Sequence, residues 1–138
     1  MKKTQQVYQK KKLNHFLKIK GIRYFGNVED VRELWSKSNI AILLSKREGL
    51  PLSLMEAAAV GRAIIATNVP GCREIAIHKY NSITVEPGDI YATRDAILKL
   101  SKNKKIRRHY AANSRKLVES DMSLVNICEQ YYKLYNSL

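Results

Sequence analysis

The sequence predicts an α/β domain with about four parallel strands, flanking helices and a helical C-terminus. Two observations support this class. Short apolar runs alternate with helical segments between residues 22 and 88, and such alternation is typical of a parallel sheet. The length of 138 residues fits one domain, since domains most often contain roughly 100–150 residues. Within it we expect a basic helix at 1–20, an α/β core at 21–88 and C-terminal helices at 89–138.

The first elements are predicted in the N-terminal half. Residues 14–20 fit the end of a helix, and the β-prone run at 22–25 fits a strand. Residues 30–37 place their apolar side chains on one face of a helix. Residues 40–44 are continuously apolar, which predicts a strand that is buried on both faces.

A second set of elements follows this strand. Pro51 suits the first turn of a helix and Gly61 lies just past its end. Residues 63–66 and 83–85 are short apolar runs that predict two more strands. Asp89 can cap the next helix through its side chain. Two further helices are predicted over residues 104–119 and 123–135.

The composition restricts the classes of partner. A net charge of +13 favours an anionic partner such as nucleic acid, acidic lipid or a phosphorylated substrate. A lysine-rich surface without a function explains the charge equally well. The sequence has no zinc-knuckle spacing, RNP-like aromatic block or helix-turn-helix pattern, so we expect no specific nucleic-acid partner.

Cellular location is predicted from what the sequence lacks. No apolar run approaches the ~20 residues that cross a bilayer, and the basic N-terminus has no apolar segment of a signal peptide. Cys72 and Cys128 form no CxxC pair and are expected to be unpaired thiols in a reducing compartment. These features predict a cytoplasmic protein.

The loop after the strand at 40–44 combines three features of a ligand site. It leads into a helix N-terminus, whose unpaired N–H groups and partial positive charge suit phosphate. Gly49 lets the backbone approach a ligand closely. Glu48 and Glu56 are carboxylates that can accept hydrogen bonds from sugar hydroxyls. These residues alone indicate an anion or nucleotide ligand, and either glutamate can instead be an ordinary helix-dipole or surface carboxylate.

Residues 47–67, REGLPLSLMEAAAVGRAIIAT, resemble the signature of family 4 glycosyltransferases, which have the GT-B fold. That signature is a glutamate, seven residues, a second glutamate, an alanine-rich helix, a glycine and an apolar strand; Glu48 and Glu56 match its spacing. The resemblance covers roughly residues 13–136 and includes YFGNV at 24–28 and VPGCRE at 69–74. It implies a partial Rossmann-like domain, namely the C-terminal donor-binding domain of a retaining enzyme, truncated at its N-terminus.

The resemblance also implies roles for particular residues. Glu48 would contact the donor sugar as the catalytic residue, and Glu56 would bind the nucleotide ribose. The donor would be a nucleoside-diphosphate sugar, used as a substrate without a cofactor or a metal. Gly71 and Glu74 are weaker candidates for shaping the pocket, since a structural turn explains them equally well. Backbone groups would face the diphosphate at Gly49, Leu50, Leu52 and Ser53, and the base at Asn27 and Val28.

Parts of the family pattern are absent from the sequence. The N-terminal acceptor domain is missing, and so are two central strands with the basic residues that neutralise the leaving diphosphate; Lys46 and Arg47 are weak substitutes. We therefore expect a chain that is weak or inactive alone, with an N-terminal glycosyltransferase domain in another chain as a candidate partner. The expected setting is polysaccharide or lipopolysaccharide synthesis, with peripheral contact at the inner membrane. The alternative is a non-catalytic module that binds an anion or a partner.

The missing strands also affect the sheet. In the family's strand order, both would lie between the strand at 22–25 and the strand at 40–44. Their loss would leave the second of these with an unpaired edge, which is an aggregation hazard. We expect either that residues 22–25 move over to pair with residues 40–44, or that another polypeptide fills the gap.

Overall fold

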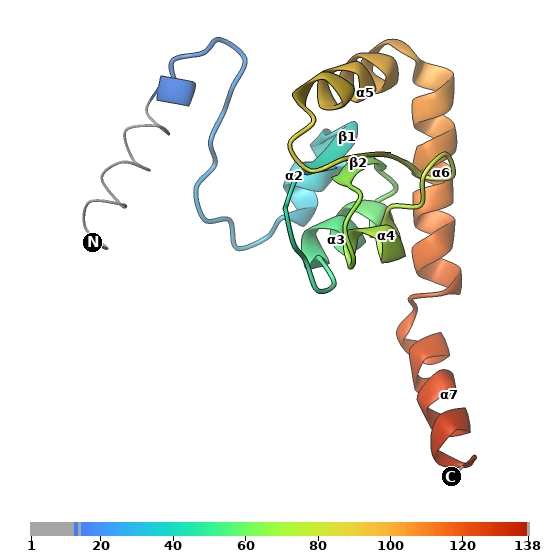
Figure 1. Cartoon of the computed structure of the whole chain (residues 1–138). Helices are drawn as coiled ribbons and strands as arrows, with labels where there is room; N and C mark the ends of the chain where they lie inside the picture. Colours follow the sequence, from blue (N-terminus) through green and yellow to red (C-terminus); the bar gives the residue numbers. More distant parts are fainter. Residues whose placement is uncertain (1–12, 14, 138) are drawn as a thin grey trace. The chain divides into compact units, whose positions relative to one another are not determined.

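The computed structural model describes residue 13 and residues 15–137, and its chain divides into two compact units, Met1–Val31 and Arg32–Leu138. Of the expected basic helix at 1–20, residues 1–12 and 14 lie outside the described residues. Leu13, His15 and Phe16 are helical, and Gly21 follows in a left-handed conformation with φ of 95°. The second unit contains the whole of the sheet (Figure 1).

The strand predicted at residues 22–25 does not form. These residues are neither helix nor strand, and the sheet of the described residues has three strands rather than about four. A β-prone run becomes a strand only when a neighbour satisfies its backbone groups. No strand in the described part of the chain pairs with it, so the expected pairing with residues 40–44 is also absent.

The sheet is parallel, as predicted. Its strands are β1 (Ile40–Leu43), β2 (Ala63–Thr67) and β3 (Ser82–Val85), in the order β1-β2-β3. Ile40 pairs with Ala63, and Ile64 with Ser82. All three strands therefore end at the same edge, where ligands bind in open α/β sheets.

The central strand β2 is buried along its whole length, and its alternating side chains divide the core into two layers. Ile64 packs in one layer with Leu54 of the helix that follows β1, and Ile65 packs in the other with Leu100. The expectation that β1 is buried on both faces is wrong. Ala41 is buried, but Ile42 is 43% exposed, because β1 is an edge strand whose one partner among the described residues is β2.

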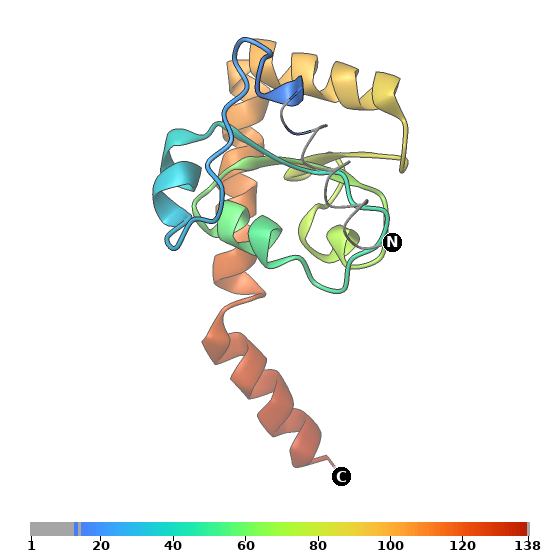
Figure 2. The same cartoon turned by 90° about the vertical axis from the view of Figure 1, so that its left-hand side faces the viewer.

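Helices cover both faces of the sheet (Figure 2). On one face Leu54, Ala57 and Ala58 join the first core layer. On the other face Ala96 and Leu100 join the second. The helices of this unit are α2 (Arg32–Lys37), α3 (Leu52–Ala59), α4 (Cys72–Ile75), α5 (Ile90–Lys102), α6 (Lys104–Ser120) and α7 (Leu124–Tyr135).

The three C-terminal helices begin with side-chain caps. Asp89 accepts a hydrogen bond of 2.8 Å from the backbone N–H of Ala92, which confirms the predicted cap. Asn103 caps α6 in the same way, and Ser123 caps α7. Each cap satisfies one of the N–H groups that a helix leaves unpaired at its start.

Helix α7 has no buried residue. Its apolar side chains face solvent, with Tyr132 71% and Tyr135 73% exposed, and Figure 1 shows the helix beyond the end of α6. Among the described residues, no helix is both long enough and apolar enough to span a membrane.

Candidate functional site

The loop between β1 and α3 carries most of the predicted site residues. It leaves the carboxyl end of β1 at Leu44 and reaches Pro51, at the N-cap position of α3. Glu48 is half-buried, whereas Gly49 and Leu50 are exposed. The loop is therefore at the edge of the sheet where the sequence placed it.

Helix α3 turns its remaining predicted site residues to solvent. Leu54, Ala57 and Ala58 form its buried face. Ser53 and Glu56 are exposed, and Leu52 is 70% exposed. With about 3.6 residues per turn, Leu52 and Glu56 lie one above the other on this outer face. The geometry leaves both side chains free to contact a ligand.

The N-terminus of α3 has no side-chain cap, in contrast to α5, α6 and α7. Pro51 occupies the N-cap position, and its carbonyl oxygen accepts from the N–H groups of Leu54 and Met55. The N–H groups of Leu52 and Ser53 precede Leu54, the first residue whose N–H donates to the Pro51 carbonyl, so they have no acceptor within the helix. They are donors available to an anion, and the helix dipole favours negative charge at the same place.

Two neighbouring side chains from the end of β2 and the start of α4 lie beside this loop. The Thr67 hydroxyl, which is 1% exposed, donates a hydrogen bond of 2.5 Å to the carbonyl oxygen of Ser45. Cys72 is a buried free thiol. Burial raises the pKa of Cys72, a hydrogen bond with the Thr67 side chain lowers it, and the charge of Glu48 raises it, so that the overall direction is upward. The negative charge of Glu48 therefore affects the ionisation of the Cys72 thiol.

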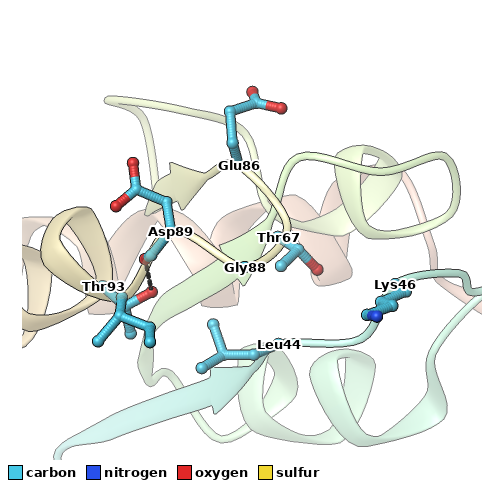
Figure 3. A pocket seen from close by; sticks show the side chains of 8 residues that line it. Leu44, Lys46, Thr67, Glu86, Gly88, Asp89 and Thr93 are labelled. Carbon is cyan, nitrogen blue, oxygen red and sulfur yellow. Dashed lines mark hydrogen bonds between the residues drawn. The ribbon is translucent and has the colours of Figure 1, made fainter.

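A cavity of about 270 Å³ opens at the carboxyl ends of the strands (Figure 3). Leu44, Thr67 and Glu86 contribute from the residues at the ends of β1, β2 and β3, and Lys46 contributes from the loop. The start of α5 closes the other side, where Thr93 donates a hydrogen bond of 2.7 Å to the carbonyl oxygen of Asp89. The full lining is Leu44, Lys46, Thr67, Glu86, Gly88, Asp89, Ile90 and Thr93.

The residues that line the cavity differ from the predicted site residues, although the loop between β1 and α3 contributes to both groups. Glu48 and Glu56 do not line the cavity. Lys46 does, and its side chain is exposed. Asn27 and Val28 belong to the first compact unit, whereas the two glutamates belong to the second. Glu74 is exposed on α4, whereas Gly71 is buried.

Sequence reasoning missed several residues at the same edge. Thr67 and Glu86 directly follow the strands predicted at residues 63–66 and 83–85, and neither was singled out as a site residue. Glu86 accepts a hydrogen bond of 2.7 Å from the side chain of Asn68, which in turn accepts one of 2.8 Å from Arg73. A usable signal was present, because each polar residue directly follows or ends a predicted strand. Among the described residues, no three His, Cys, Asp or Glu side chains gather in a metal-binding arrangement.

The three parallel strands with helices on both faces define a Rossmann-like α/β domain. Comparison with protein families identifies the class more closely. Residues 3–117 match the family described as Glycosyl transferases group 1, and the chain belongs to this family. The predicted family resemblance is therefore confirmed.

One curated relative is N,N'-diacetylbacillosaminyl-diphospho-undecaprenol alpha-1,3-N-acetylgalactosaminyltransferase of Campylobacter jejuni. It is 30% identical over 122 residues, which cover 88% of this chain and 32% of the relative. The chain thus spans about a third of the length of this relative.

Two solved structures are similar in fold. The C-terminal domain of a glycosyl transferase group 1 family protein (LpcC) from Francisella tularensis is 28% identical, with a TM-score of 0.68, and the match covers 90% of this chain and 64% of that one. Anabaena HepE in complex with UDP-glucose has a TM-score of 0.81 at 18% identity, and covers 98% of this chain and 37% of that one. The chain corresponds to the C-terminal domain of the family.

Proposed function

We propose that the chain binds a nucleoside-diphosphate sugar and supports glycosyl transfer with retention of configuration. The observation that carries this proposal is the uncapped N-terminus of α3, which follows the Glu48 loop at the carboxyl edge of the sheet. A diphosphate satisfies free helix N–H groups and complements the helix dipole. Family membership adds the class of ligand, and HepE, which shares the fold, was solved with UDP-glucose.

In this proposal each group has a distinct role. The backbone N–H groups of Gly49, Leu50, Leu52 and Ser53 bind the diphosphate. Glu48, in the middle of the loop, accepts hydrogen bonds from the hydroxyls of the sugar. Glu56, on the exposed face of α3, accepts them from the ribose. Backbone groups at Asn27 and Val28 contact the base.

Turnover needs more than donor binding. A departing diphosphate requires electrostatic stabilisation, which is a leading contribution to many such transfers. The loop itself carries two cations, Lys46 and Arg47, and both are exposed. We propose that efficient transfer depends on an N-terminal glycosyltransferase domain supplied by another polypeptide. Without that domain, the chain acts as a non-catalytic anion-binding module.

The proposed setting is synthesis of a cell-surface polysaccharide or lipopolysaccharide, in the cytoplasm and peripherally at the inner membrane. Support comes from the Campylobacter relative, whose name gives a sugar linked to diphospho-undecaprenol as its acceptor. The net charge of +13 suits an approach to anionic lipid or to a diphosphate-linked acceptor.

Calorimetric titration of the full chain with UDP-glucose, UDP-N-acetylgalactosamine and GDP-mannose tests the proposal. We expect saturable binding of at least one of these nucleotide sugars, and a loss of roughly tenfold or more in affinity for Glu56→Gln, since each 1.4 kcal/mol is a factor of ten. Glu129→Gln is a matched control, because it removes the same charge from an exposed position on α7. Absence of saturable binding to the whole panel, or equal losses in both variants, would refute the proposal.

A further inference from the structure

The turn before α4 lies directly against the loop that carries Glu48. A Cβ atom placed on Gly71 would overlap the carbonyl oxygen of Gly49. It would also lie 2.7 Å from the carbonyl oxygen of Glu48, a separation that real Cβ atoms do not adopt. The two backbones therefore touch where Gly71 has no side chain.

Gly71 is required for a second, independent reason. Its φ of 82° lies in the left-handed region, which residues with a Cβ rarely adopt. Four residues earlier, Thr67 contacts the same loop by donating its 2.5 Å hydrogen bond to Ser45. The segment at residues 67–71 thus contacts the loop at residues 45–49 near both of its ends.

We infer that Gly71 is a positioning residue for the proposed donor site. The missing side chain lets the turn support the carbonyl groups of Glu48 and Gly49. This contact fixes the peptide planes of the loop, and with them the direction of the Glu48 side chain and of the following N–H groups. The inference rests on the proposed function, because the loop has a binding geometry to maintain only if it binds the donor.

The strain of a positive φ and the steric overlap can be separated by a matched variant. Gly61 also has a positive φ, of 67°, but a Cβ there would lie 3.4 Å from its nearest neighbour, the carbonyl oxygen of Ala111. Gly61→Ala therefore adds the same kind of backbone strain without the overlap. Gly61 follows α3 at the end opposite the site.

The test compares the affinity of wild type, Gly71→Ala and Gly61→Ala for UDP-glucose, or for GDP-mannose if the wild-type chain prefers guanosine. All titrations are run at a temperature at which circular dichroism shows each variant folded. We expect both alanine variants to melt at lower temperature, and only Gly71→Ala to lose affinity, by about tenfold or more. Equal affinity of the two alanine variants would overturn the inference.

A second pair of variants covers the case in which Gly71→Ala does not fold. Thr67→Val removes the hydroxyl that holds the other end of the loop, and Thr67→Ser retains it. We expect Thr67→Val to lose affinity by several-fold while Thr67→Ser stays within about twofold of wild type. Equal binding by both would overturn the inference that this segment positions the loop. If wild type itself binds none of the nucleotide sugars, the proposed function fails first, which is a distinguishable result.

Discussion

Thr67 and Ser45 join two strand ends through a single hydrogen bond of 2.5 Å, donated by the Thr67 hydroxyl to the Ser45 carbonyl oxygen. Thr67 ends β2, and Ser45 lies two residues past the end of β1. Because Thr67 is buried, its hydroxyl exchanges no hydrogen bond with bulk water. The bond therefore stabilises the fold and the proposed site together.

Replacing Thr67 with valine keeps the shape of the side chain but removes the donor. The Ser45 carbonyl then loses its side-chain partner, and such a hydrogen bond contributes about 0.5–1.5 kcal/mol to stability. Urea denaturation of Thr67→Val should show that loss in the free energy of unfolding. The control Thr93→Val removes a hydroxyl that bonds within the first turn of α5 and should cost less. An equal cost at both positions would contradict this account.

The two cysteines should differ in reactivity. Cys128 is exposed and Cys72 is buried, so iodoacetamide at pH 8 should alkylate Cys128 in the folded chain and leave Cys72 unmodified. In urea both should react, which mass spectrometry can establish for each peptide. Rapid alkylation of Cys72 in the folded chain would contradict the prediction, because it would show that the reagent reaches this thiol.

The same thiol makes stability depend on pH. Burial raises the pKa of Cys72 in the folded chain, so the folded state holds the proton up to higher pH than the unfolded state. Its contribution to stability is fully present below the unfolded thiol pKa of ~8.5. It is lost as the pH rises from there through the folded pKa. Urea midpoints of wild type should therefore fall more steeply than those of Cys72→Ala above pH 8.5; parallel curves would contradict the prediction.

Amide exchange should differ between the edge and the centre of the sheet. Strand β2 pairs on both sides, whereas β1 pairs on one side among the described residues. Hydrogen–deuterium exchange should therefore be faster for residues 40–43 than for residues 63–67. Uniform protection of both strands in the isolated chain would indicate that an additional polypeptide segment or a second copy already covers β1.

Strand β1, which pairs on one side only among the described residues, also predicts self-association. Ile42 is 43% exposed on β1, and a lysine on an edge strand disfavours pairing with another chain. Ile42→Lys should lower the apparent mass at high concentration in light scattering, while changing the free energy of unfolding by no more than ~0.5 kcal/mol. If the apparent mass of Ile42→Lys rises with concentration as it does for wild type, the prediction is contradicted. The association would then involve another surface, for instance α7.

Local patterns predicted most of the fold. The alternation of apolar runs with helices gave the parallel sheet, and Asp89 caps α5 as its position indicated. The strand at residues 22–25 was predicted wrongly, since a β-prone composition does not supply a partner. The prediction that β1 is buried on both faces was also wrong. A run of apolar residues does not reveal which strand lies at the edge of the sheet.

The site was predictable only in part. The position of Glu48 in a loop at the carboxyl edge follows from strand–loop–helix order. The contact between Gly71 and Gly49 joins residues 22 positions apart, and no periodicity in the sequence encodes it. The role of Thr67 was not predictable either. A threonine after an apolar run gives no sign in the sequence that its hydroxyl donates a hydrogen bond to the neighbouring loop.

Mapping the bound nucleotide sugar on the full chain tests the central claim most directly. In a ¹H–¹⁵N correlation spectrum titrated with UDP-glucose or GDP-mannose, saturable shifts should concentrate at the amides of Gly49, Leu50, Leu52 and Ser53. The shifts of those amides should be clearly smaller in Glu56→Gln at the same ligand concentration, as a roughly tenfold loss of affinity requires. Shifts confined to the lysines and arginines between residues 99 and 108, with the start of α3 unchanged, would contradict donor binding and indicate non-specific attraction of an anion.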